Sequence, residues 1–103
     1  MSVILEFSMF PTDKGESKSE SVAKSIQIIQ DSGLPYKMGS MGTTIEGEWD
    51  DVLKVVSNCF QEMKKSSGRI YTSIKMDYRR DGENRMEKKI KSVESRLSAK
   101  EGS

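Results

Sequence analysis

Two segments near opposite ends of the chain alternate their side chains with a period of two, and this pattern constrains the fold most. In residues 3–10, the more apolar alternate positions are Val3, Leu5, Phe7 and Met9. In residues 70–77, the corresponding positions are Ile70, Thr72, Ile74 and Met76. Because successive side chains of a strand point to opposite faces, both segments are predicted to be β-strands that turn one face toward a core.

Two segments between these strands repeat their apolar residues at helical intervals instead. The first repeat comprises Val22, Ile26 and Ile29 and ends before Gly33, which suits a left-handed helix stop; the second comprises Val52, Val56, Cys59 and Met63. Ser17 and Glu20 have capping-box spacing for the first helix, and Trp49 is expected to be a core anchor at the start of the second. Residues 36–39 and 43–48 are predicted to be short strands, joined by a turn at residues 40–42.

The predicted order is therefore strand, helix, strand, strand, helix, strand. A third amphipathic helix follows, with its apolar positions at Met86, Ile90, Val93 and Leu97. This order is typical of the α+β ferredoxin-like βαββαβ sandwich, in which a four-stranded antiparallel sheet carries two helices on one face. We predict that fold, with an extra C-terminal helix, as a single domain over residues 1–103.

The composition excludes several classes of function. The chain of 103 residues has 17 basic and 16 acidic side chains, a net charge of +1, one cysteine and no histidine. Near-neutral charge gives no general attraction to nucleic acid or membranes, and the missing histidine removes the usual catalytic base and metal ligand. The apolar N-terminal segment is too short for a signal peptide or a membrane span. We expect a cytoplasmic protein without nucleic-acid or membrane partners, metal site or catalytic residues.

The sheet face turned away from the two helices, here called the open face, carries a polar set of side chains. Its predicted members are Glu6, Ser8, Phe10, Thr44, Glu46, Tyr71, Ser73, Lys75 and Asp77. Three interpretations of this face are open. It is solvated, or it is covered by a second copy or by the third helix, with Glu6 or Glu46 paired to Lys75. Alternatively, it forms part of a small-ligand pocket at a subunit boundary. In the last case, a carboxylate could accept two hydrogen bonds from an amino-heterocycle.

Four separated motifs, MSVILEFSMFPTDKGES, SGLPY, MGTTIEGEWDDV and IYTSIKMDYR, resemble the thiamine-binding protein family in the same order along nearly the whole chain. The resemblance implies a ferredoxin-like homo-oligomer, a tetramer formed as a dimer of dimers through sheet edges and faces. It also implies binding of thiamine or its hydroxymethylpyrimidine part, with no turnover and no cofactor. The ligand-binding positions carried over from the family are Glu6, Ser8, Met41, Gly42, Thr43, Thr44, Glu46 and Lys75.

Three hypotheses of function follow. The first is non-enzymatic binding of thiamine or hydroxymethylpyrimidine, in which Glu46 and Glu6 read the aminopyrimidine and Glu46→Gln abolishes binding. The second is a structural or interaction protein whose polar open face is only an oligomer interface. The third is an enzyme that uses acids, Tyr71 and Lys75 to move protons, which the lack of histidine and of a metal cluster disfavours.

Overall fold

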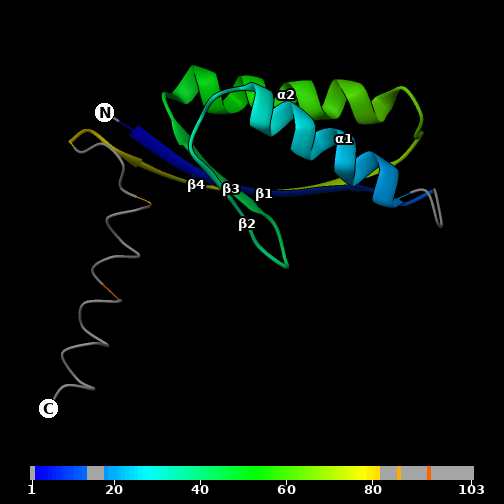
Figure 1. Cartoon of the computed structure of the whole chain (residues 1–103), viewed down its shortest axis with the longest axis horizontal. Helices are drawn as coiled ribbons and strands as arrows, with labels where there is room; N and C mark the ends of the chain where they lie inside the picture. Colours follow the sequence, from blue (N-terminus) through cyan, green and yellow to red (C-terminus); the bar gives the residue numbers. More distant parts are fainter. Residues whose placement is uncertain (1, 14–17, 82–85, 87–92, 94–103) are drawn as a thin grey trace, which may run out of the picture.

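The computed structural model describes residues 2–13 and 18–81, together with Met86 and Val93. Its elements, in chain order, are β1 (Ser2–Pro11), α1 (Lys18–Asp31), β2 (Tyr36–Met38), β3 (Thr43–Gly47), α2 (Trp49–Lys64) and β4 (Ile70–Arg79). Figure 1 shows α1 and α2 together on one face of the sheet. The predicted α+β ferredoxin-like order is confirmed.

The four strands form one antiparallel sheet in the order β2-β3-β1-β4, so β1 is interior and β4 is an edge strand. β1 pairs with β4 along its full length, from Ser2 opposite Arg79 to Pro11 opposite Ile70. Its pairing with β3 stops at Phe7, which lies opposite Thr43. Beyond Phe7, the described structure therefore gives β1 a neighbouring strand on one side only.

The hydrophobic core lies between the sheet and the two helices, as the two periodicities predict. One face of β1 contributes the predicted alternate set, Val3, Leu5, Phe7 and Met9, and the facing stripe of α2 contributes Val52, Val55, Val56, Cys59 and Met63. Each large aliphatic side chain that leaves water in this way stabilises the fold by roughly 1.5–3 kcal/mol.

The helix ends follow the sequence signals where the structure describes them. Gly33 has φ of 77°, which lies in the left-handed region that glycine adopts without strain, so α1 ends as predicted. The predicted N-cap residue Ser17 lies outside the described residues. Most of the predicted third helix, residues 86–97, also lies outside them, although Met86 and Val93 are both helical.

Trp49 does not form the predicted core anchor. It is the first residue of α2, and its side chain is 50% exposed. Helical side chains tilt toward the N-terminus of their helix, so the first residue projects beyond the helix start rather than onto the sheet. The prediction failed because the buried stripe of α2 begins at Val52, one turn later.

The described helices also bear on the question of membrane insertion. Within residues 2–13 and 18–81, no helix has both the length and the apolar character that crossing a membrane requires.

Candidate functional site

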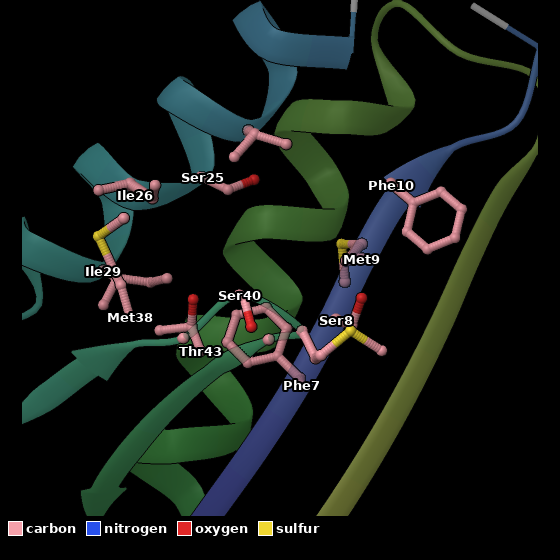
Figure 2. Close-up of a pocket in the computed structure, with 14 residues that line it drawn as sticks. Phe7, Ser8, Met9, Phe10, Ser25, Ile26, Ile29, Met38, Ser40 and Thr43 are labelled. Carbon is pink, nitrogen blue, oxygen red and sulfur yellow. The ribbon is translucent and has the colours of Figure 1, made fainter.

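A cavity of about 410 Å³ opens where α1, the second half of β1 and the β2–β3 hairpin meet. Figure 2 shows the side chains around it, which come from all three elements. The lining residues are Phe7, Ser8, Met9 and Phe10 of β1, Val22, Ser25, Ile26 and Ile29 of α1, and Met38, Gly39, Ser40, Met41, Gly42 and Thr43 of the hairpin. Its volume falls within the roughly 300–1,000 Å³ that is usual for small-molecule sites.

The cavity exists because the strands differ in length. β1 has 10 residues and β3 has 5, so the sheet narrows just where α1 continues above it. Part of the predicted apolar stripe of α1 therefore has no part of β3 packed beneath it. Ile29 is only 2% exposed, whereas Val22, two turns nearer the helix start, is 41% exposed. The exposed fraction of the α1 side chains therefore rises from Ile29 at the floor of the cavity to Val22 at its mouth.

The hairpin turn forms the side wall of the cavity and is held close to β1. The Gly39 N–H donates to the Gly42 C=O at 2.8 Å, which closes the turn. A Cβ placed on Gly42 would lie 3.0 Å from the main-chain oxygen of Phe7. Only glycine fits at this distance without displacing the hairpin from β1.

The described residues that line the cavity are uncharged. Among the described lining residues, none has an ionisable side chain; the hydroxyls come from Ser25, Ser40 and Thr43, and the main chain adds further polar groups. Ser8 also lines the cavity, but its even-numbered position in β1 puts its hydroxyl on the open face. Methionines and the Phe7 ring contribute much of the remainder, and these groups pack well against flat heterocycles. Nowhere in the described part of the chain do three His, Cys, Asp or Glu side chains gather as metal ligands would. The cavity therefore suits an uncharged or weakly polar aromatic molecule.

Cys59 lies behind the cavity wall and takes no part in its chemistry. Its Sγ donates to the Ser25 C=O at 3.7 Å, and the side chain is fully buried. Burial raises the pKa of the Cys59 thiol to about 11, so the thiol stays protonated at neutral pH. The sequence-based prediction that this cysteine is a core residue is confirmed.

The structure divides the predicted site residues into two groups. Four of them are lining residues of the cavity: Met41, Gly42 and Thr43 of the hairpin, and Ser8 of β1, whose side chain lies on the open face by its register. The other four are Glu6, Thr44, Glu46 and Lys75, whose strand register places them on the open face. The α1 residues of the cavity were missed because an apolar stripe gives the same signal whether it meets a core or a cavity.

Glu46 is the most enclosed carboxylate of the open face. The residue is only 4% exposed, and its Oε1 accepts a hydrogen bond from the Met86 main-chain N–H at 3.2 Å. Met86 is itself buried. Met86 therefore covers Glu46 on the open face, while the question whether the predicted third helix covers this face falls on residues outside the described ones.

Other charged residues of the open face are exposed in the described structure. Glu6 and Lys75 are cross-strand partners and both are exposed, yet within the described structure no ion pair joins them. At the far end of the same face, the rings of Phe10 and Tyr71 lie 5.6 Å apart at 34°. An exposed cross-strand charge pair contributes little to stability, so these charges remain open to other partners.

The fold and the site together define a class: a small ferredoxin-like α+β protein with a neutral cavity beside its β2–β3 hairpin. Residues 5–94 match the family model described as thiamine-binding protein. The chain belongs to the thiamine-binding protein family.

Individual relatives agree with this assignment. The UPF0045 protein MJ1052 of Methanocaldococcus jannaschii is 34% identical over 91 residues, which cover 88% of this chain and 91% of that protein. The UPF0045 protein MT1949 of Mycobacterium tuberculosis is 36% identical over 98 residues, covering 94% and 96%. The crystal structure of MJ1052 covers 89% of this chain and 95% of its own with a TM-score of 0.80. A Thermotoga maritima structure, TM0486, shares the fold at 23% identity, with a TM-score of 0.77 over 89% and 99%.

Proposed function

We propose that the protein binds thiamine or its hydroxymethylpyrimidine part, without turning it over, in the cavity between α1, β1 and the hairpin. The observation that carries the proposal is the neutral cavity of about 410 Å³, to which four of the eight predicted ligand residues contribute. Membership of the thiamine-binding protein family supports the choice of ligand.

The lining chemistry suits the pyrimidine half of thiamine. A substituted aminopyrimidine is flat, uncharged and rich in hydrogen-bonding groups along its edge. The side chains of Phe7 and Met38 offer apolar contacts, while the hydroxyls of Ser25, Ser40 and Thr43 can donate or accept. The cationic thiazolium gains no charge partner from this lining, so we place it toward the mouth near Val22, where water reaches it.

The described lining residues include no group that could perform a reaction on such a ligand by proton transfer. General acid–base catalysis needs a titratable group within hydrogen-bond reach of the substrate, and the described lining offers none. We therefore propose a binding role rather than an enzymatic one.

Isothermal titration of the purified protein with hydroxymethylpyrimidine, thiamine and thiamine phosphate tests the proposal. Val22→Trp places a large ring at the mouth of the cavity and should weaken binding at least tenfold. Ala23→Trp is the matched control, because Ala23 is exposed on the same helix but does not line the cavity.

Each outcome has a separate meaning. Saturable micromolar binding that is lost only in the Val22→Trp variant supports the cavity site. Binding that both variants retain would move the ligand to the open face, near Glu6 and Lys75. No heat from any of the three ligands would refute the binding function.

The second candidate function is assembly through the sheet, and the exposed edge strand favours it. No described strand pairs with the outer edge of β4, a strand of 10 residues that exposes Tyr71, Ile74 and Tyr78. Long edge strands with exposed apolar side chains pair readily with another chain. We propose a homo-oligomer, a dimer of dimers, in which this edge and the open face are interfaces. Sedimentation velocity should show a tetramer that Ile74→Lys dissociates; a wild-type monomer would contradict this.

A further inference from the structure

Two hydrogen bonds fix the direction in which the main-chain groups of β1 point. The Thr12 N–H donates to the Arg69 C=O at 3.0 Å, on the side of β4. The Glu46 N–H donates to the Pro35 C=O at 3.1 Å, on the side of β2, so the odd-numbered residues of β3 turn their groups toward β1. Within a strand, the N–H and C=O of one residue point the same way and the direction alternates along the chain.

Even-numbered residues of β1 therefore bond to β4, and odd-numbered residues point to the opposite edge. Phe7 uses that edge to pair with Thr43, the first residue of β3. Met9 is the next odd residue, and no strand of the described structure lies beside it there. In the part of the chain that the structure describes, no turn, loop or side-chain hydrogen bond reaches the Met9 main chain from that edge.

Pro11 agrees with this assignment. It lies within β1 opposite Ile70, yet proline has no N–H to contribute to a ladder. Proline is tolerated in a strand where its nitrogen faces a free edge. By the same alternation, Pro11 and Met9 face the same free edge of β1.

By this alternation, the N–H and C=O of Met9 point to the edge of β1 beside which the cavity lies, since Met9 is one of the lining residues and the hairpin closes the same edge beside Phe7. No described residue bonds to them there. The Met9 N–H is a hydrogen-bond donor and the Met9 C=O an acceptor, and both point to the same side of β1 next to each other. An aminopyrimidine carries the complementary pair: a ring nitrogen that accepts, next to an exocyclic amino group that donates.

We propose that the main chain of Met9 is the specificity element of the cavity. Its N–H donates to a pyrimidine ring nitrogen and its C=O accepts from the neighbouring amino group, so the ligand adds to the edge of β1 as a short strand would. This inference rests on the proposed function, and it narrows the ligand to uncharged heterocycles with adjacent acceptor and amino donor positions. Pyrimidines without the amino group should bind poorly.

The first test compares two ligands on the wild-type protein by isothermal titration. These are hydroxymethylpyrimidine and the same molecule without its amino group. The inference expects the second to bind at least about tenfold more weakly, because the Met9 C=O is then buried without a partner.

The second test compares Met9→Pro with Met9→Ala, with circular dichroism and thermal unfolding to check the fold. Both variants lose the methionine side chain, but only proline removes the N–H, and Pro11 shows that β1 accepts proline at this edge. Met9→Pro should bind hydroxymethylpyrimidine at least about tenfold more weakly than Met9→Ala. If Met9→Pro does not fold, the two ligands on the wild-type protein decide the question.

The outcomes separate this inference from the proposed function. Binding of hydroxymethylpyrimidine that is insensitive both to the amino group and to Met9→Pro would overturn the inference and leave the proposed function in place. Absence of hydroxymethylpyrimidine binding to the wild-type protein would overturn both.

Discussion

Replacement of Gly42 by alanine should both destabilise the fold and damage the cavity. The added Cβ would lie 3.0 Å from the Phe7 main-chain oxygen, 3.5 Å from the Phe7 carbonyl carbon and 3.6 Å from Glu6 Cγ. The closest of these atoms belongs to the interior strand β1 and cannot rotate away. The hairpin must therefore move from β1 by a few tenths of an ångström.

The magnitude follows from two opposing effects. Overpacking of this kind costs about 1–3 kcal/mol. Alanine also restricts the unfolded chain, which offsets about 0.4–1 kcal/mol of that cost. The net loss is then between about 0 and 2.6 kcal/mol, with a middle value of about 1.3 kcal/mol. At about 4–8 °C per kcal/mol for a domain of this size, that middle value lowers Tm by roughly 5–10 °C.

Gly68→Ala is the control for this measurement. Its Cβ would meet only the Asp13 carboxylate oxygen, at 3.4 Å, so the favourable effect on the unfolded chain remains without a main-chain clash. Scanning calorimetry of both variants, with hydroxymethylpyrimidine titrations, compares them directly. Equal Tm values and equal affinities in Gly42→Ala and Gly68→Ala would refute the reasoning that the hairpin packs against Phe7 and shapes the cavity.

Three further predictions concern buried groups. Ser67 Oγ is buried and has no hydrogen-bond partner in the described structure, so Ser67→Ala should raise the free energy of unfolding by about 1 kcal/mol in urea titrations, and a decrease would show that the hydroxyl is satisfied. Because burial raises the pKa of the Cys59 thiol from 9.0 to about 11, the unfolded chain loses this proton first, and stability should fall by up to about 1.4 kcal/mol per unit between pH 9 and 11. That slope should be absent in Cys59→Ala, and an unchanged slope would assign it to other groups. Glu46→Gln should weaken the bond from the Met86 N–H and lower stability by about 1 kcal/mol, while calorimetric titration still detects hydroxymethylpyrimidine binding; loss of binding would place the ligand on the open face.

The sequence alone predicts those helices and strands whose apolar residues all pack into the core between the sheet and the helices. The alternate set of β1 and the buried stripe of α2 were both found where the pattern placed them. These predictions succeed because a period of 2.0 or 3.6 residues follows directly from strand and helix geometry. The element order then limits the fold to the ferredoxin-like arrangement.

The cavity could not be predicted in the same way, because it depends on how far two strands pair. Nothing in the sequence states that β3 stops opposite Phe7 while β1 continues to Pro11. Without that mismatch, Val22 and Ile26 are indistinguishable from core residues. The burial of Glu46 has a similar cause, since its partner Met86 lies 40 residues away along the chain.

The unequal lengths of β1 and β3 also affect how this cavity would change in evolution. In the proposed site, part of the wall is the main chain of Met9, and substitution of a side chain leaves that donor and acceptor where they are. Among the common amino acids, only proline would remove the donor. Two related chains could therefore differ at most of their cavity side chains and still present the same polar edge. For this site, the length of strand pairing is a better guide to shared ligand recognition than the identity of the lining residues.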